Sequence, residues 1–474
     1  MKLEDIDVDV TIKEVRKLLQ EEPISPALKS IIEILILLIS ILLNRLNLDS
    51  TNSSKPPSSD LNREGNNKKE NKSSRKPGGQ HGHKGTTLEP IDDPDEVLAI
   101  SIDRRTIPAG NYTQKGFETR QVFDIRIQRW VTEYQAEILE DADGNQFVAP
   151  FPEGISNRTQ YGAQIKAHAV YLSQFQLLPY QRIQDYFSDQ VNIPISPGTL
   201  VNFNKQAYEK LKSFDDWVKQ RLIESDHIHA DETGINVNGS KIWLHNASND
   251  QWTYYYPHEK RGCEAMDEAG ILPHFNGILC HDHWKPYYRY GCIHALCNAH
   301  HLRELQRAFE QDSQQWAKEM GALLEEMNIA VKVAGGVLKS DSENEYREKY
   351  RAILEEAEIE CPPPVRDETT KGKRGRLKRS KSRNLLERLK AYEDDTLRFT
   401  SNLVIPFTNN QGENDIRMTK VQQKISGCFR SIEGAKIFCR NRSYISTCRK
   451  NGVSATDSLN MLFNGVFPDF INST

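Results

Sequence analysis

Apolar residues at helical spacing predict a helix near the start of the chain, within an N-terminal helical or coiled-coil segment over residues 1–48. The positions in question, four and three residues apart, are Leu28, Ile32, Leu35, Ile39, Leu42 and Leu46. Such spacing is typical of a helix that packs along a seam against another helix. Two interpretations stay open: self-association of two copies, or docking of the helix on the chain's own core.

A polar stretch over residues 49–87 follows, rich in Ser, Asn, Lys and paired prolines, a composition that cannot build a packed core. We interpret it as a disordered basic linker. Between Arg63 and Lys84 it holds seven basic residues and two acidic ones. The run is either a solvated tail or a segment that lies along phosphates, where each neutralised charge releases a counterion.

Short alternating runs between residues 88 and 154 predict a small β module. Examples are 121–127 and 135–139, with a turn signal at 143–145. Residues 155–222 are expected to be helical. Within them Ser196 and Pro197 mark the start of a helix. The helix pair there is either a helix-turn-helix that enters a DNA groove or plain packing.

Residues 223–301 predict a sheet, in the order strand, strand, strand, helix, strand. The first strand contains Asp231 and the fourth ends in Asp282, with a hairpin turn at Asn238-Gly239 between the first two strands. This order allows the first and fourth strands to lie side by side, which would bring the two carboxylates together. The neighbouring Glu232 should face the other side of the sheet, since side chains alternate along a strand.

A third carboxylate, Glu413, lies at the predicted start of a helix in the C-terminal region, residues 402–474. A helical insertion over residues 302–401 separates it from the sheet. Within the insertion, residues 371–383 contain eight basic residues and no acidic one. This run is a solvated loop or, as its charge density favours, a segment that wraps a phosphate backbone.

Composition narrows the class of protein. The 474 residues are enough for two or three domains, and the net charge of −4 argues against a uniformly basic coat, so any polyanion must be held by local patches. All eight cysteines lie between Cys263 and Cys448, irregularly spaced, which indicates reduced, intracellular thiols. No secretory signal is apparent, and the most apolar stretch, 31–43, is too short to span a membrane.

Five segments in a fixed order resemble those of the insertion sequence 66 family of transposases. They are Asn52–Asp60, Lys76–Gly85, His229–Thr233, Cys297–Leu305, and Asn409–Arg417 with Lys424 and Phe429-Arg430-Ser431 beyond. They run over nearly the whole chain and are specific together, although each alone is weak. The resemblance implies an α/β fold class: a ribonuclease-H-like mixed sheet with a large helical insertion, preceded by an N-terminal helix, a small β module and a helical region.

The resemblance also implies an Asp-Asp-Glu triad at Asp231, Asp282 and Glu413. Their hard oxygen ligands suit Mg²⁺ or Mn²⁺, and two such ions could activate an attacking oxygen and stabilise a leaving one. The implied activity is metal-dependent cleavage at transposon ends and strand transfer into target DNA. The alternative is a catalytically inactive DNA-binding protein derived from a transposase.

One departure from the family pattern concerns zinc. Relatives usually carry paired cysteines after the Gly-Gly-Gln segment, but residues 88–150 contain none, so a cysteine-based zinc site is impossible there. Cys297 and His300 have ligand-like spacing, yet the sequence does not fix a second pair of ligands. We therefore expect a structural role for these two residues and no zinc cofactor.

Transposition implies DNA partners, both the terminal inverted repeats and the target. The basic residues expected to contact DNA are Arg75, Lys76, Lys84, Lys373, Arg374, Arg376, Lys378, Arg379, Arg417, Lys424 and Arg430. Arg417 lies one helical turn after Glu413, so it is also expected to orient that carboxylate or a phosphate beside it. The resemblance further implies homo-oligomers on DNA, accessory transposition proteins, and a cytoplasmic, nucleoid-associated location without a membrane partner.

Overall fold

The computed structural model describes residues 2–3, 6–21, 24–46, 52, 88–365 and 377–472. The predicted linker over residues 49–87 therefore lies outside the described residues apart from Asn52. So do six of the residues predicted to contact DNA, namely Arg75, Lys76, Lys84, Lys373, Arg374 and Arg376.

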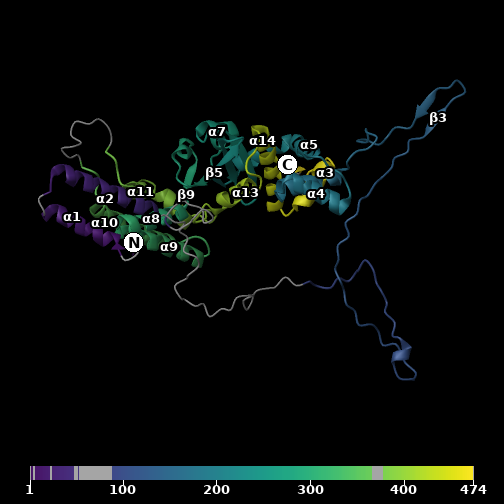
Figure 1. The fold of residues 1–474 in the computed structure, drawn as a ribbon, viewed down its shortest axis with the longest axis horizontal. Coiled ribbons are helices and arrows are strands. Elements are labelled where there is room, and N and C mark those ends of the chain that lie inside the picture. Colours follow the sequence, from purple (N-terminus) through teal and green to yellow (C-terminus); the bar gives the residue numbers. More distant parts are fainter. Residues whose placement is uncertain are drawn as a thin grey trace.

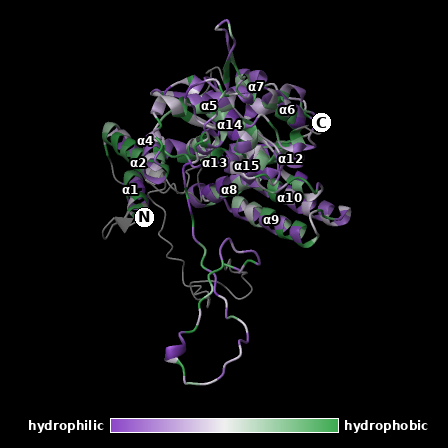
Figure 2. Cartoon of the chain, turned by 90° about the vertical axis from the view of Figure 1, so that its right-hand side faces the viewer, coloured by the Kyte–Doolittle hydropathy of each residue, from purple (hydrophilic) through white to green (hydrophobic). Residues whose placement is uncertain are grey.

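Two helices, α1 (Val8–Glu21) and α2 (Pro26–Leu46), follow the short strands β1 (Lys2–Leu3) and β2 (Ile6–Asp7) and lie near each other in both views (Figures 1 and 2). The predicted helix over residues 28–46 is thus present. Its seam is exposed at Leu28, Leu35 and Leu42, while Ile36 is buried. Among the helices of the described ranges, none combines the length and apolar content that a bilayer crossing requires.

The segment from residue 88 to residue 154 differs from the predicted β module. It holds one 3-10 turn, η2 (Arg104–Thr106), and one hairpin, β3 (Ile138–Glu140) with β4 (Gln146–Val148), and it reaches away from the remaining chain (Figure 1). The hairpin turns where residues 143–145 predict it, but residues 121–127 form no strand. Val122 remains 91% exposed. Alternation leads to a stable strand only where further strands or a helix pack against it, and this segment lacks such a partner among the described residues.

Residues 155–222 are largely helical, as predicted. The elements are α3 (Ala163–Val170), the π-helical turn η3 (Tyr171–Phe175), α4 (Tyr180–Val191), α5 (Pro197–Lys210) and α6 (Lys212–Ile223). Ser196 caps α5 by accepting the backbone N–H of Thr199, and Pro197 occupies the first turn, both as expected. Because Leu200, Phe203 and Ala207 of α5 are buried, this face of the helix serves packing; DNA reading by α4 and α5 stays a prediction.

A mixed five-stranded sheet forms the centre of the fold. Its strands are β5 (His227–Val237), β6 (Ser240–Ser248), β7 (Thr253–His258), β8 (Ile278–His281) and β9 (Ile293–Leu296). Their order is β7-β6-β5-β8-β9; β5, β6 and β7 pair antiparallel, whereas β8 is parallel to both β5 and β9. The predicted pairing of the first and fourth strands is therefore confirmed. The last strand, β9, is one that the apolar pattern does not reveal.

Short elements connect the later strands. They are α7 (Cys263–Ala269) and the 3-10 turns η4 (Leu272–His274) and η5 (Lys285–Arg289). The helical insertion follows, with α8 (Asn298–Asp312), α9 (Gln315–Val333), α10 (Ser340–Glu360), α11 (Lys381–Ala391), α12 (Glu393–Leu397) and the turn η6 (Arg398–Thr400). Its apolar core, in which Trp316, Met320 and Tyr350 are buried, also includes Cys280 of β8 and Ala295 of β9. The prediction of a helical insertion is correct.

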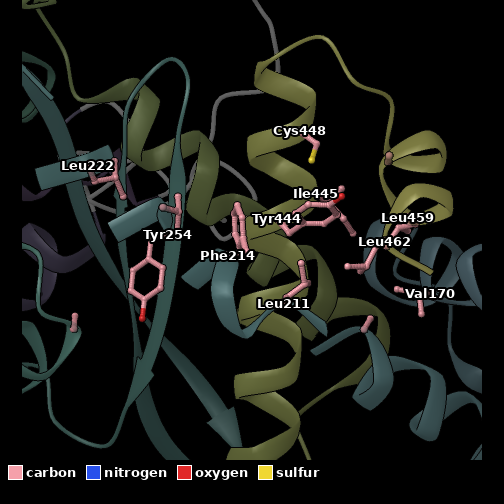
Figure 3. Packing of buried hydrophobic residues seen from close by; sticks show 14 of the residues in the cluster. Val170, Leu211, Phe214, Leu222, Tyr254, Tyr444, Ile445, Cys448, Leu459 and Leu462 are labelled. Atoms are coloured by element: carbon pink, nitrogen blue, oxygen red, sulfur yellow. The ribbon is translucent and has the colours of Figure 1, made fainter. Parts of the chain in front are cut away.

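The C-terminal region returns to the sheet. Its helices are α13 (Asn410–Ser426), α14 (Ile432–Lys450), α15 (Ala455–Phe463) and α16 (Asp469–Asn472). Tyr444 and Ile445 of α14 lie in the largest core cluster together with Phe214 of α6 and Leu459 of α15 (Figure 3). Tyr444 meets Phe214 edge to face, with ring centroids 5.3 Å apart, a favoured aromatic geometry. The sheet, the preceding helices and the C-terminal helices thus share one core.

Gly277, directly before β8, packs closely against the backbone of residues 225 and 226. A Cβ at this position would lie 2.5 Å from the carbonyl oxygen of Asp226 and 2.7 Å from that of Ser225. We expect Gly277→Ala to lower the free energy of unfolding by about 1–3 kcal/mol, the usual effect of overpacking, as measured by urea denaturation. Gly291→Ala is the matched control, because an added Cβ there meets no atom within 4 Å. Equal stability of the two variants would contradict the close approach.

Candidate functional site

Asp231 and Asp282 follow matching positions of two adjacent strands. The last paired residues of β5 and β8 are His229 and Cys280, and each aspartate comes two residues later along its own segment. Neighbouring strands are about 4.8 Å apart, so the register by itself brings the two aspartates close together. This geometry meets the expectation that the strand order would unite them.

A left-handed turn follows Asp282 at the end of β8. The next residue, His283, has a φ of 69°, a conformation that residues other than glycine rarely adopt. One Asp282 carboxylate oxygen, Oδ1, accepts the backbone N–H of Trp284 at 3.0 Å. This hydrogen bond holds the carboxylate at the carboxyl end of the strand.

Asn409 fastens the start of α13 to the strand that carries Asp231. Its side-chain Oδ1 lies 2.7 Å from His229 Nδ1, and its Nδ2 donates to the Ala230 carbonyl oxygen at 2.9 Å. The Asn409 backbone N–H also donates to Cys297 Sγ at 3.1 Å. Since Glu413 lies in the first turn of α13, these contacts bring the third carboxylate toward the two aspartates.

Asp231 is buried and lies in the electrostatic field of other carboxylates. Burial, together with the negative charges of Glu232, Asp282 and Glu413, raises the pKa of Asp231 to about 8. The Glu232 backbone N–H donates to Asp231 Oδ1 at 2.9 Å and opposes this shift in pKa. A bound cation would relieve the repulsion, because it favours the charged form of every carboxylate near it.

Glu413 is placed among residues of α8. His300 Nδ1 lies 3.9 Å and the Arg303 guanidinium 3.8 Å from Glu413 Oε1. In the part of the chain that the structure describes, these are the basic side chains within 4.0 Å of that carboxylate. The expected contact between Arg417 and Glu413 is therefore not formed: Arg417 is exposed, and Glu413 turns toward α8. A phosphate beside Arg417 stays a prediction.

Glu232 has different partners from Asp231. Tyr287 Oη donates to Glu232 Oε2 at 2.6 Å, and Arg261 Nε donates to Oε1 at 2.9 Å. The Arg261 guanidinium also lies over the rings of Trp243 and Trp284, 4.8 and 4.3 Å from their centroids. These contacts agree with the predicted alternation, which turns Glu232 away from Asp231, and they give Glu232 a structural role.

The described basic residues predicted to contact DNA fall into two groups. Lys378, Arg417, Lys424 and Arg430 are exposed. Arg379 forms an ion pair with Glu387, so its charge is already partly balanced. Three of the exposed residues lie on α13 or shortly after it, the helix that supplies Glu413. Their contact with DNA stays a prediction.

Sequence reasoning misses three contacts near the site. Asn409 and Arg303 belong to motifs of the family resemblance, but nothing in their spacing links them to Ala230 or to Glu413. The sequence shows Lys420 only as one basic residue of the C-terminal region and predicts no partner for it. In the structure its Nζ donates to the Gly234 carbonyl oxygen at 2.8 Å. Such contacts join residues more than a hundred positions apart, so no local pattern signals them.

The donor set fits a hard divalent cation. Asp231, Asp282 and Glu413 offer carboxylate oxygens, the ligands that Mg²⁺ and Mn²⁺ prefer. Among the described residues, these three carboxylates do not form a group whose ligand atoms all lie within 4.8 Å of one another. Glu413 Oε1 is buried and has no hydrogen-bond partner among the described residues. A buried oxygen without a hydrogen bond, close to a carboxyl group with a raised pKa, is an arrangement that a cation would stabilise.

The fold defines a class: a mixed α/β protein whose central sheet carries Asp231 and, at the end of β8, Asp282, and whose later helix α13, held to that sheet by Asn409, carries Glu413. Comparison with protein-family models assigns the chain further. The model of the Transposase IS66 family matches residues 158–437, more than half of the chain. The chain therefore belongs to this family, and the resemblance found in its motifs is confirmed.

The N-terminal region matches a second family model. The model of a family of unknown function (DUF6444) matches residues 3–89, which contain α1, α2 and the predicted linker. No curated protein matched the chain. The family assignment thus rests on the region that holds the sheet, the insertion and α13.

Asn409→Ala tests the attachment of α13. The substitution removes the partner of His229 and a donor to the Ala230 carbonyl, so we expect a loss of about 1–3 kcal/mol in unfolding free energy, as for buried groups left unpaired. Urea denaturation measures the change. Asn410→Ala is the matched control, because Asn410 is exposed. If both variants unfold at the same urea concentration, Asn409 does not fasten the helix.

Asp231→Asn tests how burial and the neighbouring carboxylates act on the Asp231 carboxyl group. In the folded protein the pKa of Asp231 is about 8, against an ordinary value of 3.8, so the folded state retains a proton that the unfolded chain releases. Stability of the chelator-treated wild type should therefore fall as pH rises from about 4 to about 8. Asp231→Asn should lose this contribution, which thermal unfolding across that pH range would show. Asp216→Asn, at an exposed position, is the control and should follow the wild type.

Proposed function

We propose that the chain is a metal-dependent DNA transposase of the Asp-Asp-Glu class with a ribonuclease-H-like core. The observation that carries the proposal is the convergence of three acidic segments: the β5–β8 register aligns those of Asp231 and Asp282, and Asn409 joins the helix of Glu413 to β5. Family membership supports a role in transposition. The strand order β7-β6-β5-β8-β9, antiparallel then parallel, is compatible with the proposed core.

In this proposal Asp231, Asp282 and Glu413 hold Mg²⁺ or Mn²⁺. When bound, two such ions activate an attacking oxygen and stabilise a leaving oxygen at phosphorus. The Trp284 backbone N–H orients Asp282, and Asn409 sets the position of Glu413 through α13. Fixed ligand positions matter because in-line displacement requires the reacting atoms to be aligned.

Two successive displacements at phosphorus make up the proposed reaction. Water attacks the phosphodiester at the end of the element, which breaks a P–O bond and frees a 3′-hydroxyl. That hydroxyl then attacks a phosphodiester of target DNA, and a target 3′-oxygen leaves. Both steps have the same geometry, so one set of carboxylates serves both.

Exposed cations near the site supply the proposed DNA contacts. Arg417 and Lys424 lie on α13, and Arg430 follows it, all of them exposed. Phosphate contacts of this kind position a duplex and release counterions, but carry little sequence information. We further propose that the protein acts as a homo-oligomer on DNA, since two transposon ends must be processed together.

Cleavage assays test the proposed function. The substrate is end-labelled duplex DNA that contains the genomic sequences flanking the gene. We expect cleavage that requires Mg²⁺ or Mn²⁺ and stops with a chelator. Asp231→Asn and Glu413→Gln should each lower the rate by about 10²-fold or more, the order of magnitude for losing one preorganised electrostatic group.

Asp216→Asn, an exposed carboxylate change, controls for loss of charge alone and should leave cleavage intact. Cleavage that persists in Asp231→Asn would overturn the assignment of the triad. A wild-type protein that binds DNA with ordinary salt dependence yet never nicks or joins it would instead be an inactive DNA-binding protein.

A further inference from the structure

Cys297, His300 and Glu413 bring three different metal-binding atoms together. Their ligand atoms all lie within 4.8 Å of one another. A thiolate, an imidazole and a carboxylate are the ligands of Zn²⁺ and similar borderline cations. Mg²⁺, by contrast, takes oxygen ligands. The group therefore differs in chemistry from the three carboxylates, although it shares Glu413 with them.

The local fold builds this group from two segments. Cys297 directly precedes α8 and His300 lies in its first turn, while Glu413 comes from the first turn of α13. Asn409 joins the two segments, because its backbone N–H donates to Cys297 Sγ at 3.1 Å. Such a hydrogen bond also orients and stabilises a sulfur that binds a metal. The sequence offers two ligands here, and the tertiary structure supplies the third.

Two atoms of the group have unmet hydrogen-bonding capacity. Glu413 Oε1 and His300 Nδ1 are both buried without a hydrogen-bond partner among the described residues. They lie 3.9 Å apart, too far for a hydrogen bond. A cation between them would bind both atoms. Cys297 would be the third protein ligand, and a water molecule would be the fourth ligand.

We propose that Cys297, His300 and Glu413 form a binding site for Zn²⁺, and that its occupation withdraws Glu413 from Asp231 and Asp282. This departs from the purely structural role expected of Cys297 and His300. Binding forms S–Zn, N–Zn and O–Zn bonds and releases the thiol proton of Cys297 to solvent. The regulatory half of the proposal rests on the proposed function, because it needs Glu413 for cleavage, whereas the binding half does not.

Arg303 is the natural competitor for the site. Its guanidinium lies 3.8 Å from Glu413 Oε1 and repels a second cation there. Arg303→Ala should therefore tighten Zn²⁺ binding severalfold, as measured by competition with a chelating dye. Unchanged affinity in this variant would contradict a site that includes Glu413, the carboxylate that the Arg303 guanidinium faces.

Co²⁺ absorption tests the binding half directly. Reduced, chelator-treated full-length protein is titrated with Co²⁺, and we expect a thiolate-to-cobalt charge-transfer band that Zn²⁺ then abolishes. The band should disappear in Cys297→Ser, and the apparent affinity should fall about tenfold or more in His300→Ala, at least the effect of losing a supporting contact of a metal site. Cys428→Ser and His274→Ala are the controls, since these side chains lie outside the group, and both should keep the band.

A second group of the described residues, His258, Glu264 and Glu268, has no thiol, so Co²⁺ bound to these three cannot produce the band. Circular dichroism and thermal unfolding establish that each variant is folded, and Cys297→Ala replaces Cys297→Ser if the latter is not. A missing band in the wild type, or one that persists without Cys297, would overturn the proposal.

Zn²⁺ inhibition tests the regulatory half. With Mg²⁺ in excess, low Zn²⁺ should suppress DNA cleavage by the wild type. Cys297→Ser should need about tenfold more Zn²⁺ or above, by the same reasoning, each rate being compared with that variant's own rate without Zn²⁺. Equal sensitivity of the two proteins would overturn the regulatory role. Absence of any wild-type cleavage would instead refute the proposed function, while the Co²⁺ band still decides the binding site.

Discussion

The burial of Asp231 beside other carboxylates is the constraint that this structure has to overcome. Asp231, Asp282 and Glu413 come from distant parts of the chain, and like charges oppose their approach. Burial, and after it this repulsion, raises the pKa of Asp231. The sheet and α13 hold the three residues in place nonetheless, because hydrogen bonds and apolar packing elsewhere fix the positions of these elements. The site is thus an unfavourable arrangement that its well-packed surroundings maintain.

The support has two parts. The parallel ladder between β5 and β8 fixes the relative positions of Asp231 and Asp282 along their strands. Asn409 fixes the position of Glu413, because its side chain binds to β5 and its backbone N–H donates to Cys297. Glu232, the neighbour of Asp231, is bound by Arg261 and Tyr287. The negative charge of Glu232 is therefore partly balanced by Arg261, and Glu232 has a structural role, whereas Asp231 belongs to the proposed site.

The helical insertion does not separate Glu413 from the sheet in space. The backbone N–H of Asn298, at the start of α8, donates to the Phe407 carbonyl oxygen at 3.0 Å, and the Asn298 side chain donates to the Thr396 carbonyl oxygen at 2.9 Å. The insertion therefore leaves and rejoins the sheet at one place. Its buried core includes Cys280 of β8 and Ala295 of β9, so the insertion packs against this edge of the sheet. Its helix α8 contributes His300 and Arg303 to the surroundings of Glu413.

The sequence by itself determined the elements with strong local signals, and it pointed to the three acidic residues of the proposed site. The elements are the helix over residues 28–46, the Ser196 cap, four strands of the central sheet and the helical insertion. Strand order and family motifs singled out Asp231, Asp282 and Glu413. Local signals suffice there because hydrophobic period, capping and turn chemistry act between near neighbours. They gave a wrong prediction for residues 121–127, where the alternating segment pairs with no other strand among the described residues.

Only the tertiary structure decided which residues surround each carboxylate. It turned Glu413 toward Arg303 and His300, made Asn409 the link between α13 and β5, and placed Cys297 within reach of Glu413. These contacts depend on where the insertion leaves the sheet and where it returns, a path set by packing between remote segments that no spacing along the chain encodes.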